Sequence, residues 1–331
     1  MEAISACDAC ESHRLESFGT VTNQISGLGP YPLVRCAQCG LVFLNPRPTF
    51  EEMETFYSEG YYSTPNAQWS FSGAQRVRNL IHRQISQWYY PSMDSPSYPL
   101  LRALALAVLA LYGGGCTLDQ LLYQYPLGSR VLDVGCGSGH WLFRAREQGY
   151  DTYGVEPSPA GAQIARSLEL NVVQGDIFAA QYPDQFFDLI RAHHVFEHLH
   201  QPAATLAELG RILRPGGLVL LMMPNIGGLN FCIFGQDWAF FDVPRHLYYF
   251  SPTTIRVLCN RLALKVVTLE FNSGSLGLVG SLYSRLRRAR KPVPRWLVDS
   301  QVSRLLTRHF MFLVDRLGQG DVLEVAIARS G

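Results

Sequence analysis

Three glycines within five residues follow a short apolar stretch, residues 131–134. They are Gly135, Gly137 and Gly139. An apolar run that ends at a glycine-rich turn and continues into a stretch able to form a helix predicts a buried strand, a tight turn and a helix start. Because glycine has no Cβ, a ligand can lie directly against the main chain of such a turn. We therefore predict that this turn binds a small molecule.

The spacing of these glycines indicates which class of ligand the turn binds. The dinucleotide fingerprint GxGxxG would need a glycine at position 140, where the chain has His140. Asp133, near the strand end, would repel a phosphate group but can accept hydrogen bonds from an ammonium or amide group. The turn therefore disfavours a pyrophosphate, and an oxidoreductase that uses a nicotinamide cofactor is the weaker alternative.

Four cysteines near the start of the chain form two Cys-x-x-Cys pairs. They are Cys7, Cys10, Cys36 and Cys39. In a reducing compartment four thiolates are the tetrahedral ligand set that zinc prefers, and chance pairs of buried cysteines are the alternative. Four thiolates leave no coordination position for a catalytic water, so we predict a structural Zn²⁺. We expect the pairs on the turns of two short hairpins.

Strand and helix patterns alternate from residue 130 onward, which is typical of a parallel sheet covered on both faces. Ser158-Pro159 and Ser251-Pro252 predict the starts of two helices, and Pro215-Gly-Gly217 predicts the end of another before a strand that begins at Leu218. We also expect a strand over Leu264–Phe271 and a helical insertion near 278–318. Acids follow two of these predicted strands, at Glu156 and Asp176. Ligands of open α/β sheets bind outside the carboxyl ends of the strands. There Glu156 can accept from both ribose hydroxyls of an adenosyl ligand. Asp176 can accept from the adenine amino group, and the backbone N–H of Ile177 can reach a ring nitrogen. The alternative is that these acids only cap helices.

Residues 133–139, D-V-G-C-G-S-G, resemble motif I of the class I S-adenosylmethionine-dependent methyltransferases. Glu156 and the pair Gly175-Asp176 match the ribose-binding and adenine-binding acids of that family. The resemblance implies a Rossmann-like fold, S-adenosylmethionine as cofactor and methyl transfer to an oxygen, nitrogen or carbon nucleophile. The cofactor-binding residues that follow are Asp133, Gly135, Cys136, Gly137, Gly139, Glu156, Asp176, Ile177 and His193.

Residues 193–198, H-H-V-F-E-H, lie where the fourth predicted strand gives way to the next helix, and they resemble the family's E-V-L-E-H type of signature. Some members with that signature are thought to hold a metal through its two acids and the histidine. Here His194 replaces the first acid, so the implied transition-metal set would be His194, Glu197 and His198. The simpler interpretation is that Glu197 and His198 cap the helix and shape the site.

An aromatic-rich segment, residues 238–250, lies where we expect a substrate lid. In it Arg245 can hold a phosphate or carboxylate, and the ordinary pKa of a histidine would suit His246 to general base work near neutral pH. We predict His246 or His198 as the catalytic base. Similar W-x-x-x-D-x-P-R-H-L segments occur in methyltransferases with zinc-ribbon-like N-termini from sugar, polysaccharide and natural-product pathways. The alternative is a proline turn held by an Asp242–Arg245 pair.

Six basic residues without an intervening acid lie between Arg285 and Arg295. A solvated helix face is the simplest interpretation. A phosphate-bearing substrate, such as a nucleotide-linked sugar or a lipid-linked glycan, is the alternative.

The composition narrows the class of protein. The chain has 331 residues, of which 47% are hydrophobic, and a net charge of +1. It can bury a large core, and it has no overall charge that would recruit nucleic acid. No leader-like segment is visible, so we expect a cytoplasmic protein. The apolar run at residues 100–112 is shorter than the roughly 20 residues that span a bilayer. We predict a buried helix there, with peripheral membrane contact as the alternative.

Together these features predict an α/β protein with a Rossmann-like, doubly wound and mostly parallel sheet that has an antiparallel last strand. We expect a zinc-ribbon-like domain over residues 1–47, a helical connecting or lid region over 48–127 and a methyltransferase domain over 128–331. The predicted function is methyl transfer from S-adenosylmethionine to a small molecule, such as a sugar, nucleotide-linked sugar, glycan or natural-product intermediate. A non-catalytic scaffold that binds the cofactor is the alternative.

Overall fold

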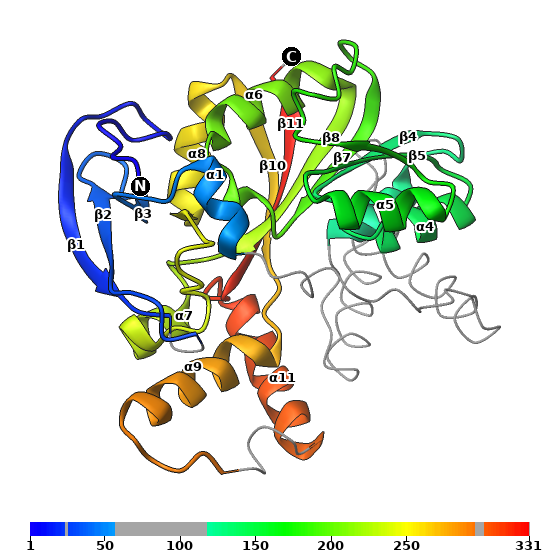
Figure 1. Ribbon diagram of the computed structural model, residues 1–331. Coiled ribbons are helices and arrows are strands. Elements are labelled where there is room, and N and C mark those ends of the chain that lie inside the picture. Colours follow the sequence, from blue (N-terminus) through cyan, green and yellow to red (C-terminus); the bar gives the residue numbers. More distant parts are fainter. Residues whose placement is uncertain (24–25, 57–117, 295–300, 331) are drawn as a thin grey trace.

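The computed structural model describes residues 1–23, 26–56, 118–294 and 301–330. Its centre is a seven-stranded sheet in the order β10-β11-β8-β7-β4-β5-β6 (Figure 1). The strands are β4 (Arg130–Val134), β5 (Asp151–Glu156), β6 (Asn171–Gln174), β7 (Phe187–His193), β8 (Leu213–Pro224), β10 (Leu264–Phe271) and β11 (Val322–Arg329). Neighbours from β6 to β8 are parallel, and β11 is antiparallel to both β8 and β10. This confirms the predicted doubly wound sheet with an antiparallel last strand.

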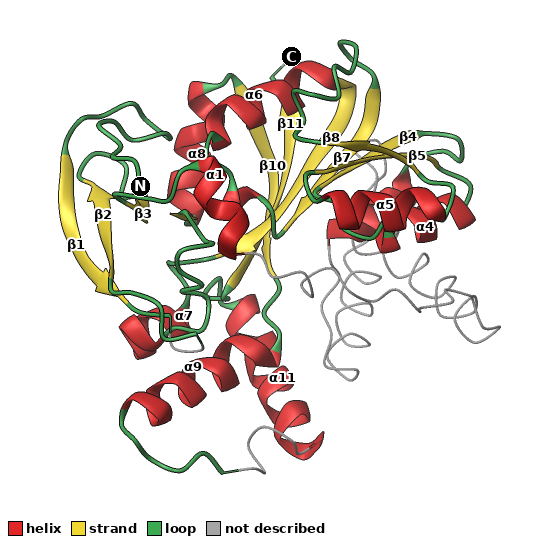
Figure 2. Ribbon diagram, viewed as in Figure 1, coloured by secondary structure: helices red, strands yellow, loops and turns green. Residues whose placement is uncertain are grey.

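Both faces of this sheet are buried, which explains the nearly continuous apolar strands. On one face Leu132, Ile190 and Leu221 belong to a core that includes residues of α6 (Pro202–Ile212) and α8 (Pro252–Arg261). On the other face Val131, Leu189 and Leu220 pack with residues of η2 (Leu118–Gln124) and α4 (His140–Glu147). Figure 2 shows the alternation of strands and helices from β4 onward. The sheet therefore forms the middle layer of three.

The helices begin where the sequence predicts. Ser158 caps α5 (Pro159–Ser167) by accepting a hydrogen bond from the Gly161 N–H, and Pro159 occupies the first turn. Ser251 and Thr254 form a capping box at the start of α8. α5 follows β5 directly, so its cap fixes the loop at the carboxyl edge of the sheet, where ligands of such sheets bind.

One strand differs from its prediction. We expected residues 215–217, P-G-G, to separate α6 from a strand that begins at Leu218, but β8 begins at Leu213, directly after α6. The register against β7 shifts here, from Phe187↔Leu213 to Leu189↔Leu218. The Pro-Gly-Gly sequence thus forms an irregularity within β8, at which the pairing with β7 is interrupted and then resumes in a shifted register.

The N-terminal residues form a second sheet, in the order β1-β2-β3-β9. Its strands are β1 (Leu15–Val21), β2 (Tyr31–Cys36), β3 (Val42–Leu44) and β9 (Tyr248–Tyr249). β9 belongs to the aromatic-rich segment 238–250 and pairs with β3 through Val42↔Tyr249 and Phe43↔Tyr248. Asp8 also accepts a hydrogen bond from the Ala203 N–H at the start of α6 (2.9 Å). The N-terminal sheet is therefore joined directly to the α/β layer.

The cysteine pairs lie on two different kinds of turn. The pair Cys36 and Cys39 lies between β2 and β3, on a hairpin as expected. The pair Cys7 and Cys10 lies on a turn before β1 and not on a hairpin between two strands, which corrects the prediction for this pair. The turn is closed by backbone hydrogen bonds, among them Cys7 N–H to Ser12 O (2.9 Å). Backbone bonding therefore replaces the expected second hairpin.

The remaining described elements are α1 (Phe50–Met53), η1 (Glu54–Phe56), η3 (Phe196–His198), α7 (Leu229–Phe234), η4 (Gly235–Asp237), α9 (Ser275–Arg288) and α11 (Gln301–Arg316). α9 and α11 form the expected helical insertion and lie below the sheet in Figure 1. Most of the predicted connecting region, including the apolar run at residues 100–112, lies outside the described residues. Within the described ranges, no helix is both long and apolar enough to cross a membrane.

Candidate functional site

The glycine-rich turn after β4 has one open position. Gly135, Gly137 and Gly139 all have positive φ, at 69°, 55° and 83°. A Cβ on Gly135 would lie 2.5 Å from Val195 Cγ2, and a Cβ on Gly139 would lie 2.4 Å from Leu170 Cδ1. A Cβ on Gly137 would meet no atom within 4 Å. The outer glycines are thus needed for close packing, and the middle one leaves its main chain open to a ligand.

Glu156 lies buried beside this turn, with 2% of its surface exposed. Its Oε2 accepts a hydrogen bond from the Gly137 N–H (2.7 Å), and its Oε1 accepts one from the Ser158 N–H (2.8 Å). Burial raises the pKa of Glu156, and these two N–H groups lower it, so that the pKa lies above its ordinary value. The carboxylate ties the turn to the start of α5. Each oxygen has a second acceptor position, so a ribose contact stays a prediction.

Asp133 is held by a residue that the sequence analysis missed. Its carboxylate pairs with Arg191 Nη1 (2.9 Å), and Arg191 Nε pairs with Asp119 of η2 (2.7 Å). Asp133 is 2% exposed; burial raises its pKa, and the Arg191 charge partly offsets this. The register of β4 against β7 places Asp133 opposite Arg191. The sequence feature that could have identified this partner of Asp133 is the single arginine, Arg191, within the largely apolar fourth strand. Contact of Asp133 with a ligand ammonium stays a prediction.

The other predicted cofactor-binding residues lie at the same edge of the sheet. Asp176 is exposed, and its Oδ1 accepts from the Ala179 N–H (2.8 Å), while Ile177 and Cys136 are buried. His193 is half-buried at the end of β7, where burial and then the Arg191 charge lower its pKa to about 3. A small crevice near it is lined by Leu118, Asp119, Arg191, Ala192, His193, Leu220, Leu221, Met222 and Glu324. The predicted cofactor-binding residues therefore lie together at the carboxyl ends of the strands.

One acid and two histidines converge next to the glycine-rich turn. Glu197 and His198 lie on η3, and His246 comes from the aromatic-rich segment. One nitrogen or oxygen atom from each lies within 4.8 Å of the other two. The Leu247 N–H donates to the Glu197 carbonyl (2.8 Å), which joins the two segments. Val195, directly before η3, is the residue that packs against Gly135. The cluster is thus adjacent to the turn.

Backbone carbonyls orient both histidine rings. His198 Nδ1 donates to Arg245 O (3.0 Å), and His246 Nδ1 donates to Phe240 O (2.8 Å). A carbonyl only accepts, so in each neutral ring the lone pair is on Nε2. Burial, followed by the charge of His198, lowers the pKa of His246 to about 4. This corrects the expectation that His246 has a pKa near neutrality, because the exclusion of water disfavours its charged form.

Glu197 is a buried carboxylate with one oxygen available. It is 1% exposed, and its Oε1 accepts from His194 Nδ1 (3.1 Å). Its Oε2 has no hydrogen-bond partner among the described residues. Burial would raise the pKa of Glu197, but the hydrogen bond from His194 and the charges of His198 and His246 lower it to about 2. The carboxylate is therefore ionised at neutral pH. The structure gathers His246, and not the predicted His194, with Glu197 and His198.

The turn that carries His246 is fixed by an ion pair. Arg245 Nη2 lies 2.7 Å from Asp242 Oδ2, as the alternative interpretation of this segment predicted. Asn23, two residues after the end of β1, donates to Asp242 Oδ1 (3.1 Å) and to the Val243 carbonyl (3.0 Å). The segment after β1 therefore contributes directly to the position of His246.

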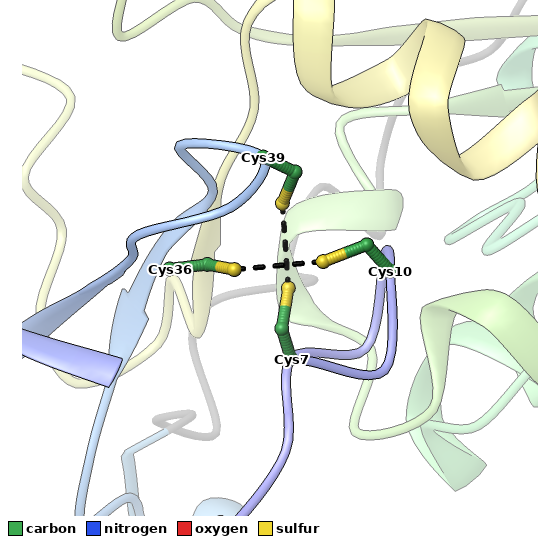
Figure 3. Close-up of side chains that lie close together, drawn as sticks. All are labelled: Cys7, Cys10, Cys36 and Cys39. Carbon is green, nitrogen blue, oxygen red and sulfur yellow. Dashed lines mark hydrogen bonds between the residues drawn. The ribbon is translucent and has the colours of Figure 1, made fainter. Parts of the chain in front are cut away.

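The four cysteine sulfurs converge on one point, as Figure 3 shows. Two sulfur pairs, Cys7–Cys39 and Cys10–Cys36, are each 3.5 Å apart. Zinc–sulfur bonds of about 2.3 Å in a tetrahedron place sulfurs roughly 3.8 Å apart, so the donor set fits zinc. Burial raises the pKa of Cys36, but hydrogen bonds from the N–H groups of Cys39 and Gln38 outweigh it and lower the pKa to about 7. This favours the thiolate form of Cys36, whereas the hydrogen bond with Cys39 and burial raise the pKa of Cys7.

Comparison with known proteins finds similarity to methyltransferases. Residues 117–269 match the family model of a methyltransferase domain. A malonyl-[acyl-carrier protein] O-methyltransferase of Serratia marcescens is 32% identical over 144 residues, which are 43% of this chain and 56% of that relative. A ubiquinone biosynthesis O-methyltransferase of Azoarcus sp. (strain BH72) is 24% identical over 59% of this chain and 83% of that relative. The structure of an S-adenosylmethionine-dependent methyltransferase from Archaeoglobus fulgidus is 23% identical, covers 69% of this chain and 93% of its own, and has a TM-score of 0.42.

Proposed function

The chain belongs to the class I S-adenosylmethionine-dependent methyltransferases, and we propose that it transfers a methyl group from S-adenosylmethionine to an oxygen of a small molecule. The observation that carries this proposal is the open main chain at Gly137, above the buried carboxylate of Glu156 and within the matched residues. Both relatives are named as O-methyltransferases, which supports oxygen as the acceptor atom.

The cofactor-binding roles follow from the positions at the strand ends. When bound, S-adenosylmethionine supplies a methyl group on a sulfonium, which is electrophilic without further activation. The main chain at Gly137 contacts the methionine portion, and Glu156 accepts from the ribose hydroxyls. Asp176 and the Ile177 N–H contact the adenine. Asp133 and His193 line the methionine side, where the ion pair with Arg191 keeps the Asp133 carboxylate in place. Catalysis is then mainly positioning.

The acceptor hydroxyl lies against the histidine pair. Because Val195 packs at Gly135, η3 and its two polar side chains are adjacent to the cofactor-binding turn. His198 takes the acceptor proton at Nε2. Buried, neutral His246 orients the acceptor by accepting a hydrogen bond from a second polar group of it, such as a neighbouring hydroxyl, because a ring with a pKa of about 4 is a weak base at neutral pH.

The acceptor belongs to the sugar, nucleotide-linked sugar, glycan or natural-product class. Arg245 is engaged by Asp242, and Arg285 and Arg288 are engaged by buried Asp237. These ion pairs make Arg245 a positioning group and not a ready phosphate ligand.

The four cysteines hold a structural Zn²⁺. The short sulfur–sulfur distances and the closed set of four ligands support this role. The metal fixes the hairpin from which β3 leads to β9, and so supports the segment that carries His246. Because thiolates persist as metal ligands in a reducing compartment, the cysteine set also supports a cytoplasmic location.

Calorimetry on the purified protein tests the proposal. S-adenosylmethionine and S-adenosylhomocysteine are expected to bind, and NAD is expected not to bind. Binding of NAD without binding of the other two would overturn the assignment of the glycine-rich turn. Transfer of a labelled methyl group to a panel of hydroxyl-bearing sugars and phenols then tests catalysis. Cofactor binding without transfer to any acceptor of the panel, including nucleotide-linked sugars, would favour the non-catalytic scaffold.

A further inference from the structure

We propose that Glu197, His198 and His246 form a second metal site, separate from the four cysteines, which binds a divalent transition ion such as Zn²⁺ through one carboxylate and two imidazoles. The three ligand atoms lie within 4.8 Å of one another. Metal–ligand bonds of about 2.1 Å hold such atoms roughly 3–4 Å apart, so a small inward movement of the side chains completes the set. The site joins η3 to a segment almost fifty residues later in the chain.

The hydrogen bonds of the two rings have the form that metal-binding histidines adopt. A ligating histidine almost always donates its other ring N–H to a carboxylate or a backbone carbonyl, which fixes both its tautomer and its orientation. His198 donates from Nδ1 to Arg245 O, and His246 donates from Nδ1 to Phe240 O. Both lone pairs are therefore on Nε2, the atom that a metal binds. The carbonyl that orients His198 belongs to Arg245, in the same segment as His246. We therefore expect the two rings to move together.

The third ligand is a buried carboxylate that needs a positive partner. Glu197 Oε1 is held by His194, and Oε2 is buried without a hydrogen-bond partner among the described residues. Leaving a carboxylate oxygen out of water without a donor is costly, and a cation at Oε2 removes that cost. His194 then serves as the hydrogen-bond partner of a ligating carboxylate, a role that fixes the direction of Oε2.

The ligand types select the class of metal. Two imidazoles and one carboxylate suit zinc and the neighbouring transition ions, whereas magnesium and calcium prefer sets made of oxygen alone. Three protein ligands also leave a coordination position open, in contrast to the closed cysteine set. The use of that position rests on the proposed function: an ion there attracts the acceptor oxygen and lowers the pKa of its hydroxyl. With the ion bound, the two histidines act as ligands and the proton of the acceptor hydroxyl passes to a water molecule. The base role proposed above for His198 then applies to the metal-free protein.

The test uses the full chain and metal alone. Purified protein is treated with a mild chelator, titrated with Zn²⁺ or Co²⁺ by calorimetry, and assayed for bound metal. Two ions per chain are expected, of which one resists the chelator. Co²⁺ at the cysteines gives thiolate charge-transfer absorption, and Co²⁺ at the new site gives only weak visible bands. His246→Gln and Glu197→Gln are expected to remove only the weak bands. Each substitution should weaken binding of the second ion by more than about 100-fold. Such a loss is larger than the one expected when only the hydrogen-bond partner of a metal ligand is removed.

His200→Gln is the matched control, because His200 lies two residues after His198 and is bonded to the Pro48 carbonyl, outside the cluster. It should keep both ions. Retained binding of S-adenosylmethionine shows that each variant is folded. A single ion per chain, lost with Cys36→Ser and unaffected by His246→Gln, would overturn the second site and leave the proposed function intact. Two ions without methyl transfer would leave the site standing and count against the proposed function.

Discussion

Gly137→Ala isolates the contact between the turn and the cofactor, and Gly128→Ala is its matched control. Both glycines have positive φ, at 55° and 84°, and a Cβ at either position meets no atom within 4 Å. Gly128 lies before β4, at the opposite end of the strand from the turn. The two variants therefore impose the same kind of backbone strain, and only Gly137→Ala places a methyl group where we propose that the ligand lies.

The strain and the contact have separate magnitudes. An L-residue in the left-handed region costs roughly 1–2 kcal/mol. The smaller entropy of the unfolded chain returns about 0.4–1 kcal/mol of this. Both variants should thus lose about 1 kcal/mol of stability, with a fall in Tm of roughly 2–4 °C. A methyl group forced into a packed contact costs about 1–3 kcal/mol more. At 1.4 kcal/mol per tenfold change, the Kd for S-adenosylmethionine should rise about 5-fold to 150-fold in Gly137→Ala alone.

Thermal unfolding and calorimetry with S-adenosylhomocysteine measure the two quantities on the same samples. The expected pattern is an equal fall in Tm and a selective loss of affinity in Gly137→Ala. Affinity within twofold of the parent protein in both variants would show that no ligand lies against this turn. An equal loss of affinity in both variants would show that the effect is transmitted through stability, and would refute the argument from open space at Gly137.

Three further predictions concern stability. Cys36→Ser should abolish binding of the tightly held zinc and lower the free energy of unfolding by at least about 3 kcal/mol. The Kd for S-adenosylmethionine should stay within about threefold of the parent value. Parallel loss of cofactor binding would contradict the separation of the two sites. Asp237→Asn should lower the free energy of urea unfolding by about 1–3 kcal/mol, because fully buried Asp237 loses charge-assisted bonds to two partly exposed arginines. As a control, Asp184→Asn removes a charge from an exposed ion pair and should change this free energy by less than about 0.5 kcal/mol. Burial raises the pKa of Glu324 to about 7, although hydrogen bonds from Asn272 and the Leu118 N–H lower it in part. The contribution of Glu324 to stability is therefore complete below the unfolded-state pKa of about 4.5 and falls as the pH rises toward 7. Glu324→Gln should flatten the pH dependence of the free energy of unfolding across that window, and an unchanged slope would argue against the raised pKa.

The sheet could be predicted because its signals are local. Each parallel strand is an apolar run covered on both faces, and each following helix begins at a capping residue, so the chain itself marks where the elements start. The strand Leu264–Phe271 has the predicted bounds for this reason. The irregular start of β8 could not be predicted, because Pro215-Gly-Gly217 is also a good helix stop and only the pairing with β7 decides between the two.

The site was predictable only in part, because its decisive contacts are long-range. The spacing of the glycines identified the turn, but nothing near Asp133 in the sequence names Arg191 as its partner; the register between β4 and β7 does. Likewise, β9 is two residues long, too short for a pattern, and its pairing with β3 joins residues about 200 positions apart. The expectation of a near-neutral pKa for His246 was wrong because the burial that lowers this pKa comes from the same long-range docking.

The N-terminal sheet is best understood as part of the site. The cysteine hairpin leads into β3, β3 pairs with β9, and the residue before β9 donates to the Glu197 carbonyl. η3 follows Val195, which packs at Gly135 of the cofactor-binding turn. Sheet pairing is geometrically strict, so a shift of β3 must displace β9 and the ring of His246 with it. A metal at the cysteines would therefore act on the reaction through the position of the acceptor-side groups, and a cofactor held by β4 and β5 would be largely insulated from it.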